Sequence, residues 1–372
     1  MTFSTLPARV RRRAPLGMVL LGASLALLLG TTAHARPLGA QGDYFLYQVE
    51  PGDTLEALAR HYTLDPGNWP TLQTLNQVAD PYLLQIARVL RIPLAIIPRR
   101  PAQAKVTHLS EQATRNGQPL RAGDRLETGD TLRSSQGSVT LTLEDHSLLT
   151  IAPDTEIQVR NLQTFRGSEL SDTVLSLPHG SVESSVAPDK TGVGRFEIRT
   201  PATVTGVRGT QLRVHANKAG SRHEVLSGEA AIRNAAHAEQ SLARDHGAAY
   251  DTSGALLGTH ALLPAPQLHP LEKGASSLTW SPVPGASAYR VRIALESAGT
   301  QLEFNQQVTQ PQISLVPSGI GVRYVFVRAI DALGIEGSDA RLSIWTPDGL
   351  ISSDGNPVRG GSDGAPIRLM DY

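Results

Sequence analysis

"FEIRTPATVTGVRGTQL", residues 196–212, alternates polar and apolar residues, breaks at Thr200-Pro201 and then resumes. Alternation with a period of two is typical of a half-buried β-strand, and proline and glycine end such runs. The stretch therefore predicts two strands and a further bend, formed by Gly206, Arg208 and Gly209. We expect a structural bend, in which the two glycines let strands kink or pass closely and Arg208 hydrogen-bonds carbonyls across it. The alternative is that Arg208 contacts a partner or an anionic ligand.

The same pattern extends through residues 105–247. Turn signals such as Gly123-Asp124 and Pro153-Asp154 separate the short runs, and no stretch keeps a helical period. The apolar positions that define the predicted strands are Val139, Leu141, Leu143, Leu149, Ile151, Ile157, Val159, Val174, Leu175, Leu177, Phe196, Ile198, Leu212 and Val214. An all-β module follows, with a sheet or roll architecture.

This region also resembles a known family. Together with "GDRLETGDTLRSSQGSVTLTLEDHSLLTIAPDTEIQV" and "LSLPHGSVESSV", the string "TPATVTGVRGT" is similar to the FecR domain. His146 stands in "EDHS" where that family commonly has glycine. Because histidine tolerates a left-handed backbone better than most residues, we expect the turn to be kept.

Residues 44–98 predict a smaller unit of strand, helix, helix and strand. Pro51-Gly52 ends the first strand, Asp53 is placed to cap the next helix with Glu56 at capping-box spacing, and Pro70 begins a second helix. "YQVEPGDTLEALARHY" and "VLRIP" closely resemble the LysM family. That resemblance implies a βααβ fold that binds N-acetylglucosamine polymers such as peptidoglycan or chitin.

The resemblance also implies where the glycan binds. In the LysM family the binding loops follow the first strand and precede the second. In this sequence they correspond to Gly52, Asp53, Thr54 and Leu55, facing Asp80, Pro81, Tyr82, Leu83 and Leu84. An alternative is that Asp53 and Thr54 only cap the helix. Ile86-Ala87 replaces the family's Pro-Gly, and since alanine disfavours positive φ, the turn is expected to differ or to display Arg88 differently. A LysM module that has lost glycan binding is therefore a second possibility.

Residues 264–346 begin with a proline-spaced linker, "LLPAPQLHP", and resemble a fibronectin type III-like sandwich. We expect Trp280 beneath one sheet and Tyr324 beneath the other. "PRRP", Pro98 to Pro101, is expected to be a stiff linker between the first two domains. Residues 347–372 lack periodicity and are expected to be disordered.

The first 35 residues resemble a secretory signal peptide. A basic segment precedes an apolar run, and "AHA" offers small residues for cleavage after Ala35; an uncleaved anchor is the alternative. Removal of four arginines with this segment leaves 30 basic and 34 acidic side chains. This balance excludes a nucleic-acid binder that depends on neutralising phosphates. The absence of cysteine excludes disulfides, cysteine nucleophiles and thiolate metal sites.

Two common catalytic motifs are absent from the sequence. No S-x-x-K or H-E-x-x-H occurs, and the one G-x-S-x-G string, at residues 360–364, falls in the segment that is expected to be disordered. A carboxylate pair for glycoside hydrolysis leaves no sequence mark. His215 and His223 are the histidine pair most worth testing as zinc ligands, but a turn between two strands explains both. We therefore expect no enzyme, no metal and no cofactor.

The sequence predicts a mainly β multidomain protein: a βααβ LysM module, an all-β FecR domain and a β-sandwich. The expected function is that of a non-catalytic periplasmic protein of a Gram-negative bacterium. It would bind peptidoglycan and present its other domains to a protein partner of unknown identity in the envelope, for sensing or scaffolding. A peptidoglycan hydrolase or its activator is the alternative. A regulator that signals across the membrane through its own cytoplasmic domain is not expected, because only about fifteen residues precede the apolar run, too few for a core.

Overall fold

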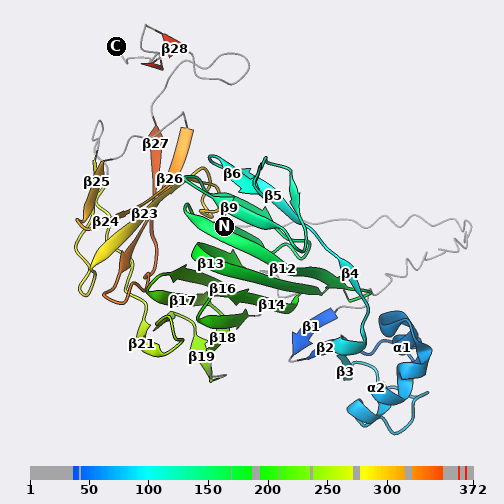
Figure 1. Cartoon of the computed structure of the whole chain (residues 1–372). Helices are drawn as coiled ribbons and strands as arrows, with labels where there is room; N and C mark the ends of the chain where they lie inside the picture. The colour runs from blue at the N-terminus through cyan, green and yellow to red at the C-terminus, as the bar shows by residue number, and fades with distance from the viewer. Residues whose placement is uncertain are drawn as a thin grey trace, which may run out of the picture. The chain divides into compact units, whose positions relative to one another are not determined.

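The computed structural model describes residues 37–41, 43–168, 170–186, 193–207, 209–234, 238–270, 277–314, 321–346, 359–360 and 365–366. The predicted signal peptide, Arg208 and most of the predicted tail lie outside these residues. Within them, no helix is long and apolar enough to cross a membrane. The chain is mainly β, with helices confined to the first domain (Figure 1). This confirms the predicted fold class.

The first domain is the predicted βααβ unit with one strand added. Its elements are β1 (Pro37–Gln41), β2 (Tyr44–Gln48), α1 (Leu55–Thr63), the 3-10 turn η1 (Pro66–Asn68), α2 (Trp69–Asn76), β3 (Val89–Pro93) and the 3-10 turn η2 (Leu94–Ile96). Both β1 and β3 pair antiparallel with β2. The sequence analysis missed β1, whose five residues precede the apolar alternation of β2.

Two polar side chains set the helix ends of this domain. Thr54, rather than Asp53, is the N-cap of α1: its hydroxyl accepts a hydrogen bond from Ala57 N at 3.1 Å. The buried Asn76 ends α2 and joins it to β3, because its Nδ2 donates to Arg91 O at 2.8 Å and its Oδ1 accepts from Arg91 N at 2.7 Å. The predicted cap at Asp53 is wrong by one residue.

The central domain contains two layers of strands around one core, antiparallel except for the parallel pair of β13 and β14. Its strands are β4 (Arg99–Pro101), β5 (Ala104–Leu109), β6 (Ala113–Arg115), β7 (Gln118–Pro119), β8 (Arg125–Leu126), β9 (Thr131–Ser134), β10 (Val139–Thr142), β11 (Leu148–Ile151), β12 (Thr155–Phe165), β13 (Ser171–Ser185), β14 (Val193–Arg199), β15 (Thr203–Val207), β16 (Gln211–Asn217), β17 (Gly220–Ser227), β18 (Glu229–Asn234), β19 (Glu239–Ala243), β20 (His246–Tyr250) and β21 (Leu256–Ala261). The apolar positions predicted above are buried, and all except Val174 belong to one core cluster. The predicted all-β module is confirmed.

Strand β13 connects the two layers. Its first half pairs with β12 and β14, and its second half pairs with β11 and β16. Gly180, between the two halves, has φ of 100°, and a Cβ there would lie 2.3 Å from Thr155 Oγ1. Only glycine fits this crossing, because both the backbone conformation and the space exclude a side chain.

The central sheet extends further than predicted at both ends. Arg99–Pro101, expected to be a linker, forms β4 and pairs with β12. The predicted end at residue 247 falls inside β20, which pairs with β17 and β21. Backbone pairing of these segments, rather than their composition, assigns them to the sheet.

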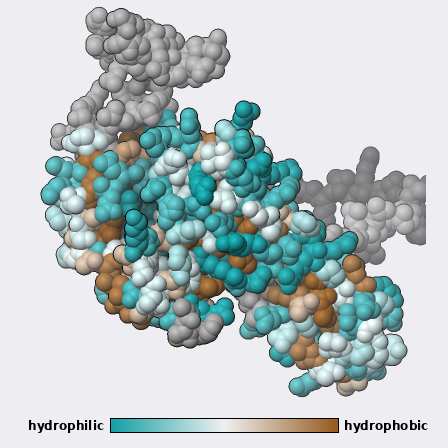
Figure 2. Space-filling view, in the orientation of Figure 1, coloured by the Kyte–Doolittle hydropathy of each residue, from teal (hydrophilic) through white to brown (hydrophobic). Residues whose placement is uncertain are grey.

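The first and central domains share a core. Phe165 and Leu170, from the turn between β12 and β13, are buried among the apolar side chains of the first domain. The guanidinium of Arg99 lies 5.0 Å from the centre of the Phe165 ring. In Figure 2 apolar surface is visible near β1–β3, whereas the visible face of the central domain is mostly hydrophilic.

The third domain has a four-stranded sheet in the order β24-β23-β26-β27 and a two-stranded ladder of β22 and β25. The strands are β22 (Ser277–Thr279), β23 (Ala288–Ala294), β24 (Leu302–Val308), β25 (Gln312–Ser314), β26 (Gly321–Ile330) and β27 (Ala340–Thr346). Trp280 and Tyr289 pack edge to face in the core with ring centroids 5.3 Å apart. The fibronectin type III-like identity stays a prediction.

Two details of the third domain differ from expectation. Tyr324 lies on the sheet face opposite the main core, beside Phe326 in a smaller cluster, because Val325 and Val327 take the inward positions. The supposed linker is paired: Ser281 N donates to Gln267 O, and His269 N donates to Thr279 O. In the tail, β28 (Arg359–Gly360) and β29 (Ala365–Pro366) form a short ladder.

Candidate functional site

The two predicted glycan loops meet at the end of the first domain where β2 ends and β3 begins. Leu55 N lies 3.5 Å from Pro81 O, which joins the loop after β2 to the loop before β3. Asp53 holds the first loop in shape, since its Oδ2 accepts from Tyr47 Oη and from Glu50 N, each at 2.7 Å. Burial and the Asp53 carboxylate raise the pKa of the Tyr47 hydroxyl, which stays protonated and donates this bond.

The exposed side chains of the site come from the second loop. Tyr82 and Leu83 are 77% and 76% exposed, although both are large apolar residues. Asp80 is exposed, and its Oδ1 accepts from Tyr82 N at 2.9 Å, which holds the turn before them. Pro81 and Leu84 are half-buried. This loop therefore offers an apolar surface with exposed backbone, which suits an uncharged sugar.

The first loop contributes mainly backbone. Gly52 is exposed with φ of 92°, and Asp53 and Thr54 are half-buried and use their side chains within the domain. Leu55 is completely buried in the core, so of this predicted glycan-binding residue only the backbone is available to a ligand. The two loops thus lie together, but they differ in role. The loop after β2 supports the site, and the loop before β3 exposes its side chains.

Ala87, in the turn before β3, has a left-handed backbone of the kind that favours glycine. Its φ is 65°, in the left-handed region, and its N–H donates to Val49 O at 2.8 Å while Val49 N donates to Arg88 O at 2.9 Å. The Arg88 guanidinium bonds the carbonyl of Asn76. These bonds hold Ala87 in a left-handed conformation that alanine disfavours. The expected difference from the family's turn, or in the display of Arg88, stays a prediction. His146, with φ of 61°, keeps the turn in the central domain, as predicted.

The bend predicted from "GVRGT" lies at Gly209. This residue has φ of 58°, whereas Gly206 lies inside β15 and is paired on both sides, with Glu197 of β14 and Ala231 of β18. A Cβ on Gly206 would meet nothing closer than Ala231 O at 4.0 Å. The prediction of a kink or close approach at Gly206 is therefore wrong. Arg208 lies outside the described residues.

His215 and His223 point to opposite faces of the central sheet. His223 is buried in the core, where its Nδ1 lies 2.8 Å from Thr205 Oγ1 and its Nε2 lies 3.0 Å from Thr203 Oγ1. Burial lowers the pKa of His223 to about 3. The two imidazoles cannot share a metal ion, because the sheet separates them. The predicted turn between β16 and β17 accounts for their spacing, as expected.

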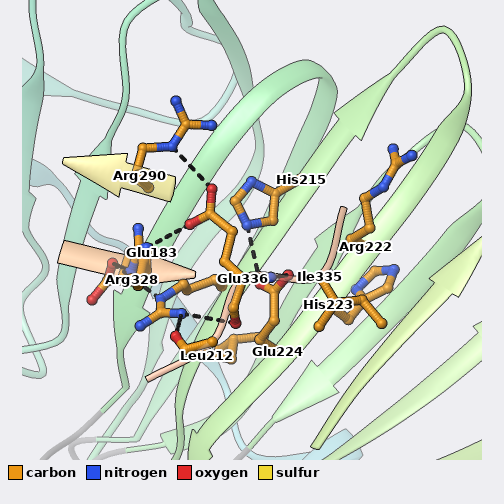
Figure 3. Close-up of polar contacts among 12 residues, drawn as sticks. Glu183, Leu212, His215, Arg222, His223, Glu224, Arg290, Arg328, Ile335 and Glu336 are labelled. Carbon is orange, nitrogen blue, oxygen red and sulfur yellow. Dashed lines mark hydrogen bonds and ion pairs between the residues drawn. The ribbon is translucent and has the colours of Figure 1, made fainter. Parts of the chain in front are cut away.

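A cluster of buried charges joins the central and third domains, and the sequence analysis missed it. Figure 3 shows Glu336 between Arg290 and Arg328 on one side and His215 and Glu224 on the other. Glu336 Oε1 accepts from Arg290 Nε at 3.0 Å, and its Oε2 lies 2.6 Å from Arg328 Nε. The backbone N of Glu336 donates to Glu224 Oε1 at 3.1 Å, across the domain boundary.

A second part of this cluster is built around two carboxylates. Glu183 Oε2 lies within 3.4 Å of Arg213, Arg292 and Arg328, and the same three guanidiniums lie within 3.5 Å of Asp339 Oδ2. Burial alone would raise the pKa of Glu183, but the arginines outweigh it and hold the pKa below its usual value. Glu183 is therefore ionised, and both carboxylates pair with the guanidiniums.

Glycines let the third domain approach the central sheet closely. A Cβ on Gly247 of β20 would lie 2.3 Å from the Ile335 side chain, and one on Gly258 of β21 would lie 2.9 Å from the Leu333 side chain. Elsewhere Ser138 Oγ donates to Leu302 O at 2.7 Å. The signal for this contact was present in "YRVRI", where Arg290 and Arg292 alternate with core residues and so lie together on the other face of β23.

Comparisons with known proteins agree with this architecture of a small helical module followed by a long β region. Residues 47–93 match the model of the LysM domain, and residues 124–231 match the model described as FecR protein. The chain therefore contains a LysM domain followed by a FecR domain. LysM domains bind peptidoglycan-type glycans. No curated protein matches the chain.

Among solved structures, the chain is similar to two crystal structures of a "putative anti-sigma factor" from Parabacteroides distasonis ATCC 8503, at 1.65 and 2.50 Å resolution. The first shares 15% identity over 35% of this chain and 59% of that chain, with a TM-score of 0.29. The second shares 16% identity over 35% and 57%, with a TM-score of 0.28. The chain thus spans less than two thirds of the length of these structures, and a likeness of this extent does not define a common fold for the whole chain.

Proposed function

We propose that this protein is a non-catalytic, peptidoglycan-binding protein of the periplasm, which presents its FecR and third domains to a protein partner in the cell envelope. The LysM domain would bind N-acetylglucosamine-containing strands through the loops after β2 and before β3. The observation that supports this most directly is the exposure of Tyr82 and Leu83 on a loop held against the N-terminus of α1. Large apolar side chains held in the open are typical of a binding surface.

The glycan contact is tested by retention of the purified protein on isolated sacculi and by titration with N-acetylglucosamine oligomers. The variant Tyr82→Ala/Leu83→Ala is expected to bind at least about 10-fold more weakly, because exposed aromatic and aliphatic anchors supply most of such binding energy. The matched control is Leu64→Ala, which removes an exposed leucine at the other end of α1, 53% exposed. Equal retention of the double variant and the unchanged protein would remove the assignment of this loop.

The remaining parts of the proposal have separate tests. Clearing of murein in a zymogram by the purified protein would replace the non-catalytic role with that of a hydrolase. Fractionation of cells that express the full chain tests the periplasmic location. Crosslinking in the envelope, with the LysM loops intact, tests for a protein partner on the β-domains.

A further inference from the structure

A cavity of about 440 Å³ lies between the central sheet and the third domain, apart from the glycan loops. Its walls come from β13 and the β16–β17 hairpin on one side and from β23, β24 and β26 on the other. A space of this volume suits a small organic molecule. Because both domains contribute to the walls, a bound ligand would contact both.

The buried charges in the walls balance one another. Arg213, Arg290, Arg292 and Arg328 face Glu183, Glu224, Glu336 and Asp339, so this group is neutral when the His215 ring is neutral. Arg292 and Arg328 are held between carboxylates on the two domains. They form the floor of the cavity and have little charge left for a ligand.

The more accessible polar groups around the cavity are mostly basic. Lys218 lies in the exposed turn between β16 and β17, and its ammonium has no partner among the described residues. Arg290 is 25% exposed: Nε donates to Glu336 and Nη2 to Gln307, while Nη1 has no partner in the described part of the chain. His179, 49% exposed, lies 3.8 Å from Asp154, whose own side chain is turned to solvent at 96% exposure. Glu183, 31% exposed, also lines the cavity, and its Oε2 is already paired with three guanidiniums.

We propose that this cavity binds a small oxyanion, a ligand with a carboxylate or phosphate group, through Lys218 and the free edge of Arg290. A guanidinium edge and an ammonium form strong charge-assisted hydrogen bonds to either group. Lys218 and the free Nη1 of Arg290 offer donors to an anion above a neutral floor. Among the described residues, the one exposed carboxylate of the rim, Asp154, is turned to solvent beside His179, so the cavity offers no pair of free acids for a cation. Binding would tighten the contact between the two domains, because Lys218 and Arg290 stand on different ones.

The test uses the full chain, with inorganic phosphate, succinate and uncharged xylose as probes in calorimetric titration. Saturable binding of phosphate, succinate or both is expected, with none for xylose; which anion binds better identifies the preferred oxyanion. Lys218→Ala is expected to weaken binding about 10-fold and Lys218→Glu to abolish it. Both variants should fold normally, because Lys218 is exposed and unpaired among the described residues.

One control variant and one further test variant make the result specific to this cavity. Lys105→Ala removes an exposed lysine of β5 that does not line the cavity, and it should leave affinity unchanged. Arg290→Lys keeps a positive charge beside Glu336 but removes the planar edge, and it should weaken binding by a similar factor. The proposal is overturned if neither anion binds saturably, or if Lys105→Ala weakens binding as much as Lys218→Ala.

Discussion

Arg328 and Glu336 form an ion pair in the third domain with Nε 2.6 Å from Oε2, and their side chains are only 5% and 4% exposed. The same glutamate donates its backbone N–H to Glu224 of the central sheet. The pair is therefore part of the contact between two domains as well as of one domain. Because of this contact, the third domain is docked on the central sheet and does not act as a free spacer.

Breaking this pair should release the third domain. Glu336→Gln leaves Arg328 and Arg290 buried without their carboxylate, and it is expected to cost about 3–5 kcal/mol in the free energy of unfolding. Urea denaturation, combined with proteolysis near residues 262–270, would measure both the loss of stability and the undocking. Glu56→Gln, which breaks the exposed Arg60–Glu56 pair, should cost at most about 0.5 kcal/mol. Similar losses for the two variants would contradict a docking role of the buried pair.

The strained turn at Ala87 should accept glycine. Ala87→Gly removes the penalty of a Cβ at φ of 65° and is expected to stabilise the first domain by about 0.5–1 kcal/mol. Ala57→Gly, on the exposed face of α1, should destabilise it by about 0.5–1 kcal/mol. Chemical denaturation of both variants gives the comparison, and a loss of stability in Ala87→Gly would show that the turn is not strained.

The two glycines of "GVRGT" should respond differently to alanine. Gly209→Ala is expected to cost about 1 kcal/mol or more, because φ of 58° is unfavourable for a residue with a Cβ. Gly206→Ala should be neutral or slightly stabilising, because the strand is extended there and the new methyl group has space. Thermal unfolding measures both; the reverse order would place the bend at Gly206.

Stability should fall with pH below about 6.5 because of His223. Its pKa is about 3 in the fold and near 6.5 when unfolded, so the unfolded state binds the proton first. The contribution of the neutral His223 to the free energy of unfolding is complete above pH 6.5. It is lost as the pH falls toward 3, by up to about 1.4 kcal/mol per pH unit. The pKa of His215 is shifted the other way: burial lowers it, but Glu224 and Glu336 outweigh burial and raise it. Its contribution is present below 6.5 and is lost as pH rises through the raised pKa.

Denaturation at a series of pH values separates these effects. His223→Gln is expected to be less stable at neutral pH but to show a flatter fall between pH 6.5 and 4.5. His246→Gln, which removes an exposed histidine of β20, should leave the slope as it is. An unchanged slope in His223→Gln would mean that other groups control the acid sensitivity.

Local patterns predicted the elements well. The alternation at Val139, Leu141 and Leu143 placed these side chains in the core, since successive residues of a strand face opposite sides. The turn at His146 was also predicted from one residue, because its backbone preference is local. The cap at Asp53 failed because two adjacent residues could fill that role, and the choice of Thr54 depends on the bond between Tyr47 and Asp53.

The sequence by itself determined the mainly β class and the LysM and FecR regions, because these depend on residue order and spacing. Only the tertiary structure decided that Phe165 completes the core of the first domain, and that Glu183 meets arginines and Glu336 meets Glu224 across a domain boundary. Such contacts join residues far apart in the chain. Whether a strand's second face meets water or another domain depends on what packs against it, which no period along the sequence records.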